Sequence, residues 1–388
     1  MKLLYLVPKF DICYNEKGSA AKPHGGTSHA RGFIFNIANY FEEVHVICKK
    51  EGKGRNKIKK GNVTIHRINF SNIKGNKTNP ISAIIKTFKY ARQLDKKNNF
   101  EVIYEREEFT SGAGSLLKLL NFKKKLILEV NSPHVSEAVW RGDLPKIASF
   151  LFRAIEELQF LIADRIITTI PSLVPKWAVK KTFLTEWSGG ENIKLVKMKK
   201  SKGKKLVLFI GSMSYWHGAY FFAKAAKRIL KKRKDVKFVL IGKGREFEKI
   251  KKEIRGFEKN IILTGGVDDS KISEYLQLAD ICVAPFESKK YPPLKKYGFY
   301  WSPIKLWDYM KAGKPIISSK IAKRIVDEKI GLTFKEGDLK DFENKIIYLI
   351  ENEELRKRMS KEAQKKWKEN NWKEHTKKIY KKVIKKLV

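Results

Sequence analysis

Short apolar runs alternate with longer helical or polar stretches along the first half of the chain. Six of these runs are rich in valine and isoleucine: KLLYLVP, VHVIC, VTIHRI, VIYER, KLILEVN and RIITTI. Runs of this length, divided by helices, are typical of strands that are buried on both faces of a parallel sheet. The pattern therefore predicts a parallel α/β domain.

The second half repeats this pattern in five further runs: KKLVLFIGS, VKFVLIGKG, NIILTGG, DICVAP and KPIISS. Helices are expected between them, among others over residues 221–232 and 271–278. The 388 residues also exceed what one hydrophobic core usually serves. We therefore predict an α/β fold with two doubly wound, Rossmann-like domains facing a cleft.

The limits of the domains follow from where the apolar periodicity fades. Lysines accumulate from Gly189 to Lys205, which predicts a linker between a first domain over 1–188 and a second over 189–371. We expect residues 372–388 to form a helix that packs back on the first domain by an apolar stripe, with its lysine face in solvent or on an anionic membrane. The stripe consists of Trp372, Ile379, Val383 and Leu387.

Glycines gather at the predicted carboxyl ends of strands, where ligands of doubly wound sheets bind. For any one glycine, a tight turn is a sufficient explanation. No G-x-G-x-x-G follows a strand, so the sequence carries no dinucleotide fingerprint. The glycines are Gly25, Gly26, Gly211, Gly242, Gly244, Gly265 and Gly266.

The stretch SPIKLWDYMKAGKPII predicts a helix whose start suits an anion. Ser302 is expected as the N-cap and Pro303 as the first helical residue. The N–H groups of Ile304, Lys305 and Leu306 would then point toward a bound anion at the positive end of the helix dipole.

Asp308 lies about a turn and a half beyond this helix start. Its carboxylate can accept hydrogen bonds from paired hydroxyls, such as those of a ribose. Alternatively, the helix is only structural, ends at Gly313 and Pro315, and leaves Asp308 in solvent. The local sequence does not decide between the two interpretations.

The same stretch resembles the S-P-x-K-x-x-E-Y-M-x-x-G-x-P-V-V block of retaining GT-B glycosyltransferases of the family-four class. Further segments fall in family order: GGTSHARGFIFNIANY, LILEVNSPHVSE, LFIGSMSYWHGAYFFAKA, TGGVDDSKISEYLQLADICVAPF and EELRKRMSKEA. The resemblance implies a GT-B enzyme, a retaining hexosyltransferase that uses a UDP- or GDP-linked sugar and no cofactor. It also implies an acceptor-binding first domain, a donor-binding second domain, and a glycan or lipid-linked acceptor.

The resemblance also implies a set of donor-binding residues, with two departures from the family. Tyr300 and Asp308 stand where many members carry E-x7-E, and Ser212 and His217 stand where many carry arginine and lysine. A protonated His217 would add positive charge, or this residue is structural. The implied donor residues are Gly26, Gly211, Ser212, His217, Lys243, Val267, Ser302, Pro303, Ile304, Lys305 and Asp308.

In the first domain, the resemblance implies that Gly25, Thr27 and His29 bind the acceptor. Asn131 stands where many relatives carry a histidine facing the reacting sugar. Because asparagine cannot act as a base, His134 becomes the candidate ionisable group, with His29 second. His134 could equally be a helix-start histidine without a chemical duty.

Glu137 completes the implied catalytic group. This carboxylate would orient the imidazole of His134, or it would cap Ser132 or Ser136. The sugar would be transferred on one face of the donor, with the leaving diphosphate taking the proton and no protein nucleophile. The sequence offers no convincing metal site, because Asp268 and Asp269 are better explained as a helix cap, so we expect turnover without metal.

The charge of the chain widens the choice of partners. Its 83 Lys and Arg residues against 41 Asp and Glu residues give a formal charge of +42, which favours phosphates, an anionic membrane surface or nucleic acid. A nucleic-acid-binding protein is the rival class, although no recognition motif supports specific binding. A GT-B epimerase and an inactive donor-binding protein remain alternatives, and the lysine content is also typical of an AT-rich genome or a hot habitat.

The remaining features indicate a cytoplasmic protein, with peripheral association at the inner face of the membrane as a further expectation. Cys13, Cys48 and Cys282 are far apart and are expected to be reduced thiols. No apolar run approaches the ~20 residues of a membrane span, and the N-terminus becomes polar too soon for a signal peptide.

Overall fold

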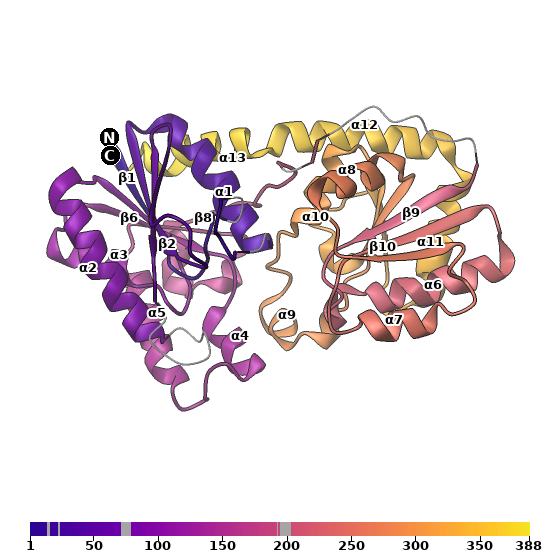
Figure 1. Ribbon diagram of the computed structural model, residues 1–388, viewed down its shortest axis with the longest axis horizontal. Helices are drawn as coiled ribbons and strands as arrows, with labels where there is room; N and C mark the ends of the chain where they lie inside the picture. The colour runs from indigo at the N-terminus through magenta and orange to yellow at the C-terminus, as the bar shows by residue number, and fades with distance from the viewer. Residues whose placement is uncertain (14–15, 22–23, 71–78, 192, 195–202) are drawn as a thin grey trace. The chain divides into compact units, whose positions relative to one another are not determined.

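The computed structural model describes residues 1–13, 16–21, 24–70, 79–191, 193–194 and 203–388 (Figure 1). The chain forms two compact units. The first contains Met1–Ser188, Tyr300–Ser302 and Trp372–Val388, and the second contains Gly189–Phe299 and Pro303–Asn371. Most of the predicted linker, at residues 192 and 195–202, lies outside the described residues.

The first unit is built on an eight-stranded sheet in the order β3-β4-β2-β1-β5-β6-β7-β8. Neighbouring strands are parallel except for the antiparallel pair β3 and β4. The strands are β1 Lys2–Val7, β2 Glu43–Lys49, β3 Lys57–Lys60, β4 Val63–Ile68, β5 Val102–Arg106, β6 Lys125–Val130, β7 Arg165–Thr168 and β8 Thr182–Leu184. Sheet order reverses between β1 and β5, so the crevice for a ligand is expected beyond the carboxyl ends of these two strands.

Helices cover both faces of this sheet. The connection from β1 to β2 runs toward one edge, and those from β4 through β7 run toward the other, so right-handed crossovers place their helices on opposite faces. In Figure 1, α1 lies beside α13, and α2, α3 and α5 follow one another along the other side. The helices are α1 Gly25–Ile37, α2 Pro80–Asn98, α3 Ala113–Leu120, α4 His134–Arg141, α5 Ser149–Ile162 and α13 Trp372–Ile379.

The apolar stripe of the last helix belongs to the core of the first unit. Trp372 is 1% exposed, and its ring centroid lies 5.1 Å from that of His29. A Cβ placed on Gly32 of α1 would lie 2.2 Å from Trp372 Nε1, so only glycine lets α1 approach the indole. Ile379 and Val383 join the same core cluster. The tail is therefore a structural part of this unit, and its apolar side is not available to a membrane.

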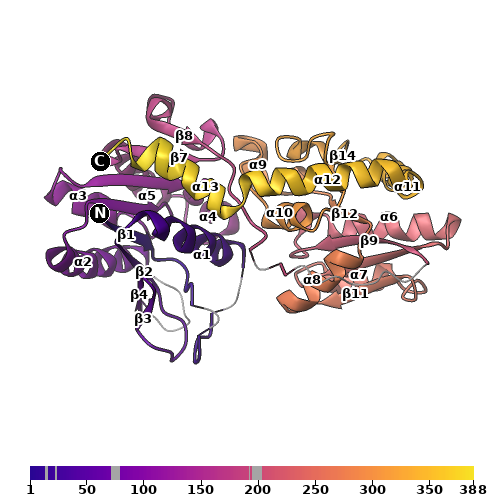
Figure 2. The same cartoon turned by 90° about the horizontal axis from the view of Figure 1, so that it is seen from above.

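The second unit is built on a six-stranded parallel sheet in the order β11-β10-β9-β12-β13-β14 (Figure 2). Its order reverses between β9 and β12, as in a dinucleotide-binding fold. The strands are β9 Lys205–Ile210, β10 Val236–Ile241, β11 Ile261–Gly265, β12 Ile281–Ala284, β13 Ile316–Ser319 and β14 Gly331–Phe334. The helices are α6 Ala219–Lys232, α7 Phe247–Glu253, α8 Asp269–Leu278, α9 Pro292–Tyr297, α10 Ile304–Lys311, α11 Leu339–Glu351 and α12 Glu353–Asn370.

This architecture confirms the predicted pair of doubly wound domains. All eleven predicted apolar runs contain strands, and the helices expected at 221–232 and 271–278 are α6 and α8. The sequence did not reveal β3, β8 and β14. Over the described ranges, no helix combines the length and the apolar content that crossing a bilayer requires.

Candidate functional site

The start of α10 lies one residue later than the sequence indicated. Pro303, with φ −67° and ψ 119°, occupies the N-cap position, and Ile304 is the first helical residue. The predicted N-cap, Ser302, instead donates its hydroxyl to the carbonyl oxygen of Trp187 at 2.9 Å. The N–H of Leu306 donates to Pro303 O at 3.0 Å. The N–H groups of Ile304 and Lys305 therefore remain for an anion at this helix start, rather than the three expected.

Lys305 is a buried cation in the first turn of α10. Lys305 is 9% exposed, and its Nζ has no hydrogen-bond partner among the described residues. Nζ lies 4.5 Å from the ring centroid of Phe209 and 5.5 Å from that of Phe286. Burial lowers the pKa of Lys305 to about 7. A buried ammonium without a counter-ion is costly, so an anion beside Nζ would stabilise it strongly.

The aromatic neighbours locate Lys305 at the reversal of strand order in the second sheet. Phe209 belongs to β9, and Phe286 follows β12 by two residues. Gly211 directly follows β9 with φ +142°, and a Cβ there would lie 2.5 Å from Lys305 Nζ. Glycine is therefore favoured by its backbone conformation, and the ammonium of Lys305 lies close to this position. The structure thus brings Gly211 and Lys305 together at the crevice where doubly wound sheets bind ligands.

His217 lies at the same carboxyl edge, and its contacts favour the structural alternative over a positive charge. Its Nδ1 lies 2.9 Å from Ser212 O, so the ring donates Nδ1–H to that carbonyl oxygen. Burial lowers the pKa of His217 to about 3, and the charge of Lys305 adds to this effect. The imidazole is therefore neutral near pH 7. The Ser212 and Ser214 hydroxyls form a hydrogen bond, with 2.8 Å between their Oγ atoms.

Asp308 is only partly exposed, in contrast to the alternative in which it faced solvent. Burial raises the pKa of Asp308 to about 7, and Asp269 adds to the rise. Lys311 and a hydrogen bond from the backbone of Gly190 oppose it. Asp269 begins α8, where Asp268 accepts a hydrogen bond from Lys271 N at 2.9 Å. The predicted cap at Asp268 is therefore confirmed.

Two further predicted donor residues, Lys243 and Val267, follow neighbouring strands at this edge. Lys243 is exposed, and a Cβ on Gly266 would lie 3.6 Å from its Cδ. Val267 is partly exposed and comes directly after this glycine. Lys243 therefore lies over the end of β11, whereas Lys305 lies over the ends of β9 and β12. The two lysines belong to different parts of the same edge.

In the first unit, Gly25 and Gly26 are the first two residues of α1. The N-cap is His24, whose Nδ1 accepts a hydrogen bond from Gly26 N at 3.1 Å. The Thr27 hydroxyl accepts from His24 N and donates to His24 O, at 2.9 Å each. The predicted acceptor residue Thr27 is thus engaged in the cap, and its side chain is buried. The sequence did not identify His24, because histidine is not among the preferred N-cap residues.

The second candidate base, His29, lies in the core rather than at an open edge. Its Nε2 lies 2.9 Å from Glu129 Oε1, and its ring packs edge-on against Trp187 and Trp372. Burial lowers the pKa of His29. The pKa of Glu129 is lowered to about 2 because His29, Arg106 and Asn131 together outweigh its burial. Asn131 donates its side-chain N–H to Glu129. These contacts favour a structural role for His29.

His134 begins α4 and is buried among carboxylates. Its Nδ1 lies 3.0 Å from Glu108 Oε2, and its Nε2 lies 3.7 Å from Glu107 Oε2. Burial lowers the pKa of His134 well below its usual value, with Lys9 contributing. Burial and the nearby charges of Glu156 and Glu108 raise the pKa of Glu107 well above its usual value. Burial thus disfavours the charged forms of both His134 and Glu107, and both side chains can hydrogen-bond hydroxyls.

The carboxylate of Glu137 accepts hydrogen bonds from Ser132, Arg141 and Tyr300. Its Oε2 accepts from the Ser132 hydroxyl at 3.2 Å and from Arg141 at 3.3 Å, and its Oε1 accepts from the Tyr300 hydroxyl at 2.6 Å. Ser132 Oγ in turn lies 3.0 Å from His134 Nδ1. Tyr300 is fully buried in the first unit. Glu137 therefore hydrogen-bonds Tyr300 directly, and it acts on His134 through its charge and through the shared contact with Ser132.

The sequence analysis did not single out Glu107, Glu108 or Lys9. Lys9 donates to Glu108 Oε2, which joins the chain after β1 to the chain after β5. This is the reversal point of the first sheet. A signal was present in the run YEREEF, where two glutamates directly follow a strand. The predicted residue His134 and these three side chains form one polar cluster, which we call the β1–β5 cluster.

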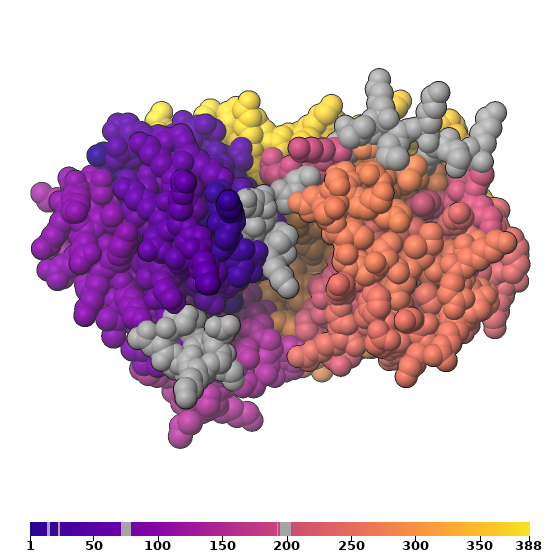
Figure 3. Space-filling view, in the orientation of Figure 1, coloured from indigo at the N-terminus to yellow at the C-terminus, as the bar shows by residue number. Residues whose placement is uncertain are grey.

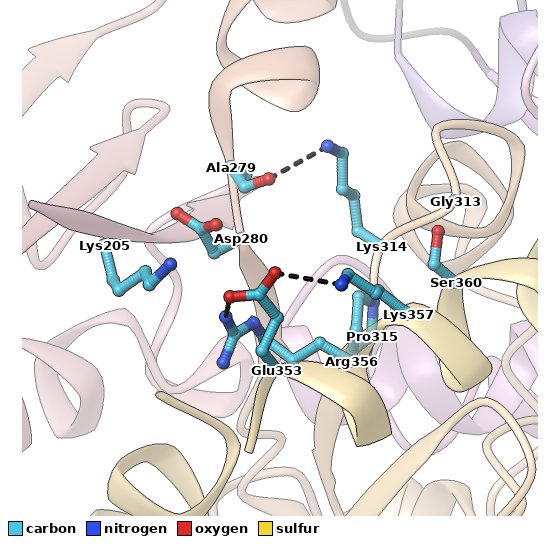
Figure 4. A pocket seen from close by; sticks show the side chains of 10 residues that line it. All are labelled: Lys205, Ala279, Asp280, Gly313, Lys314, Pro315, Glu353, Arg356, Lys357 and Ser360. Atoms are coloured by element: carbon cyan, nitrogen blue, oxygen red, sulfur yellow. Dashed lines mark hydrogen bonds and ion pairs between the residues drawn. The ribbon is translucent and has the colours of Figure 1, made fainter. Parts of the chain in front are cut away.

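A pocket of about 310 Å³ lies at the opposite, amino edge of the second sheet (Figure 4). Its charged groups satisfy one another or the backbone. Glu353 lies 3.1 Å from Lys357 and 3.9 Å from Arg356, and Lys314 donates to Ala279 O at 2.9 Å. The pocket therefore offers less to an anion than the buried Nζ of Lys305 does.

Comparisons with known proteins concern the family and the fold. Residues 204–352 match the family described as glycosyl transferases group 1. An uncharacterized glycosyltransferase of Methanocaldococcus jannaschii is 27% identical over 316 residues, which cover 75% of this chain and 76% of the relative. A second one from the same organism is 26% identical over 167 residues, which cover 41% and 43%.

Solved structures resemble the whole chain. Sucrose-phosphate synthase from Thermosynechococcus elongatus has a TM-score of 0.75 at 14% identity, and Anabaena HepE in complex with UDP has 0.68 at 14%. Both matches cover 100% of each chain. At such identities, the similarity shows the fold alone. The chain therefore has the GT-B fold, and residues 204–352 are similar to the family described as glycosyl transferases group 1.

Proposed function

We propose that this protein is a retaining hexosyltransferase that moves a sugar from a UDP- or GDP-linked donor to a hydroxyl of a glycan or lipid-linked acceptor. The family match over residues 204–352 supports sugar transfer from a nucleotide sugar. The similar fold of Anabaena HepE, which was solved with UDP, supports the choice of donor. The retention of configuration rests on the resemblance of the SPIK block alone.

One observation carries the proposal: Lys305 is a buried ammonium at a helix start, with no hydrogen-bond partner among the described residues. A diphosphate would supply the missing anion, and the N–H groups of Ile304 and Lys305 would donate to its oxygens. Binding of the anion would raise the pKa of Lys305 from about 7, so the side chain would be fully charged in the complex.

This arrangement stabilises a leaving nucleoside diphosphate without further protein chemistry. Negative charge grows on the diphosphate as the glycosidic bond breaks, and fixed N–H dipoles and the ammonium are already oriented toward it. We propose that the leaving diphosphate takes the proton of the acceptor hydroxyl and that no protein nucleophile is used. Asp308, the fifth residue of α10, would accept hydrogen bonds from the ribose hydroxyls.

We also propose that the reaction needs no divalent metal. Within the described ranges, no group of three or more His, Cys, Asp or Glu side chains is arranged to hold one. The ammonium of Lys305 would neutralise part of the diphosphate charge that a metal ion neutralises in other transferases.

The β1–β5 cluster is the candidate acceptor site of the first unit. Its buried groups include Glu107 Oε2, which accepts no hydrogen bond from a described residue. Sugar hydroxyls are donors that fit such carboxyl oxygens. Because His134 is held neutral, its proposed role is to hydrogen-bond an acceptor hydroxyl, not to act as a strong base.

The test is binding and turnover with a panel of nucleotide diphosphates and their sugars. We expect UDP or GDP to raise the melting temperature of the wild type, because a ligand that binds only the folded state stabilises it by mass action. Lys305→Ala should lose this shift, whereas the matched variant of the exposed Lys237 should keep it. Stabilisation that is equal in all three proteins would remove Lys305 from the site.

Product analysis separates the alternatives. Transfer of labelled sugar to an added acceptor with the same anomeric configuration supports the proposal. Conversion of the donor to an isomeric nucleotide sugar would indicate an epimerase, and binding without turnover would indicate an inactive donor-binding protein. Tight, sequence-dependent binding of DNA or RNA without any nucleotide-sugar binding would move the protein to the rival class.

A further inference from the structure

The outer face of α5 is an exposed apolar stripe. Phe150 is 75% exposed and Leu161 is 61% exposed, and Leu151 and Leu158 are also exposed between them. These positions recur at intervals of one, seven and three residues, which keeps them on one side of a helix. The opposite side of α5 is buried against the first unit through Phe152, Gln159 and Phe160. Helix α5 thus has a second apolar side that does not pack on the first unit.

The neighbouring elements extend this stripe. The exposed residues Leu119 and Leu120 end α3, and Phe122 follows them. Lys118 of α3 pairs with Asp164 just beyond α5, which places the carboxyl ends of the two helices side by side. On the other flank, Lys181 donates to Leu161 O at 3.0 Å and lies 5.5 Å from the ring centroid of Trp177, which is itself exposed.

The adjoining helix α2 adds positive charge to this surface. A Cβ on Gly112 would lie 3.8 Å from Ile84 of α2 and 3.9 Å from Ile155 of α5, so α2, α3 and α5 converge there. The outer positions of α2 begin with two exposed isoleucines and continue at helical spacing with exposed cations. In chain order, they are Ile81, Ile85, Lys89, Arg92 and Lys96.

We propose that the face formed by α2, α3 and α5 docks on an anionic lipid surface. We call it the α2–α5 face. It combines a band of large exposed side chains with basic residues on its flank, which is the composition of proteins that lie in the membrane interface. The purple surface at the left of Figure 3 belongs to the part of the chain that contains α2 and α3. The exposed Trp177 suits the level of the lipid headgroups.

The positive charge of the chain favours a lipid surface over a second copy of the chain as the partner of the α2–α5 face. The formal charge of +42 means that two copies brought together at this face would repel each other. An anionic bilayer would instead attract the lysines and cover the apolar stripe. The carboxylate of Asp164 is paired with Lys118, and the exposed carboxylate of Glu157 flanks the stripe and opposes this attraction. The nearby exposed cations Lys146, Lys176 and Lys180 outnumber it.

The orientation of α5 gives the proposal a link to the acceptor. Because α5 follows β6 and precedes β7 in a crossover, its first residues lie at the carboxyl edge of the sheet. Arg153 of α5 donates to Ser136 of α4, the helix that begins with His134. Ile147, which is 84% exposed, and Phe150 therefore lie at the same end of the unit as the β1–β5 cluster. A bilayer on this face would present a lipid-linked acceptor near that cluster.

The experiment is cosedimentation of the full-length protein with vesicles, without any sugar donor. One set of vesicles contains phosphatidylglycerol, and the other consists of phosphatidylcholine alone. We expect binding to the anionic vesicles only. The double variant Phe150→Ser/Leu161→Ser should bind about tenfold more weakly or worse, since burying one such side chain is worth about that factor. Replacing Lys89, Lys96 and Lys97 by glutamine should cost up to about fivefold per lysine at low salt.

Matched variants of the second unit serve as controls. Tyr348→Ser removes a half-exposed aromatic residue, and glutamine at Lys231, Lys232 and Lys237 removes three exposed charges. These controls should bind like the wild type, and thermal unfolding should show that every variant is folded, because all the replaced side chains are at the surface.

Vesicle binding that survives the Phe150 and Leu161 changes would overturn the proposal, as would equal binding to neutral vesicles. If the wild type binds no vesicles but forms a dimer that the double variant abolishes, the face belongs to a second copy of the chain. Vesicle binding is measured without sugar transfer. The proposed function can therefore be wrong while the proposed lipid surface is right, and the lipid surface can be wrong while the function is right.

Discussion

Replacing Lys305 by methionine should make the unliganded protein more stable and abolish its affinity for nucleotide diphosphates. Methionine has a similar length, carries no charge and can pack against Phe209 and Phe286 in the same place. The side chain of Lys305 lowers stability because it must be buried either charged or after losing a proton. The binding site would thus be maintained at a cost in stability, as is common at functional sites.

The magnitude follows from the pKa of Lys305, which is 10.5 for an ordinary lysine and about 7 in the folded protein. Between these values the unfolded state binds more protons than the folded state, so the stability of the wild type rises with pH. Burial of Lys305 lowers the unfolding free energy by its full amount below about pH 7, and this effect disappears as the pH approaches 10.5. Linkage puts it at about 5 kcal/mol at pH 6 and about 2 kcal/mol at pH 9.

The assay is urea unfolding of the wild type and Lys305→Met at several pH values, in chloride buffers free of phosphate and sulfate. We expect the difference in unfolding free energy to favour the variant most at low pH and to shrink as the pH rises. Addition of UDP or GDP should then stabilise the wild type only. A variant that is less stable than the wild type at every pH would refute this reasoning, because Nζ would then have a stabilising partner.

Four further predictions concern the site and the fold. Asp308→Ala should weaken nucleotide binding by about 1–3 kcal/mol in calorimetry, since a charged hydrogen-bond acceptor is lost; unchanged affinity would exclude contact with the ribose. Sugar transfer should persist in EDTA, and activity that is abolished by EDTA and restored by magnesium or manganese would contradict the metal-free mechanism. Tyr300→Phe should lower the unfolding free energy by about 1–3 kcal/mol, because Glu137 loses a buried donor, and an unchanged urea midpoint would argue against this bond. Trp372→Ala should cost about 3–5 kcal/mol by opening a cavity beside Gly32, which a loss below 1 kcal/mol would contradict.

Periodicity predicted most of the fold, because strands that are buried on both faces consist of continuous apolar runs. The strand β3, KIKK, escaped because three of its four residues are exposed lysines and only Ile58 is buried. It pairs at the edge of the sheet, antiparallel to β4. Edge strands of this kind need little apolar character, so their presence depends on a partner that local sequence does not show.

The candidate site was predicted less completely than the fold. The helix start was predicted from SPIK, but its cap was not, because the hydroxyl of Ser302 donates to the distant carbonyl oxygen of Trp187. The burial of Lys305 depends on Phe209 and Phe286, which come from two other segments. A sequence motif gives the identity of a side chain, whereas its pKa depends on neighbours that only the fold assembles.

The path of the chain through the two units also has a consequence for synthesis. The ribosome synthesises the second unit, which ends at Asn371, before the helix that carries Trp372, Ile379 and Val383. The first 188 residues must therefore wait, with the apolar side of α1 uncovered, until this helix has been made. Only then can the first unit complete its core. The part that is translated first is thus the part that is finished last, and a nascent-chain chaperone would find its target there.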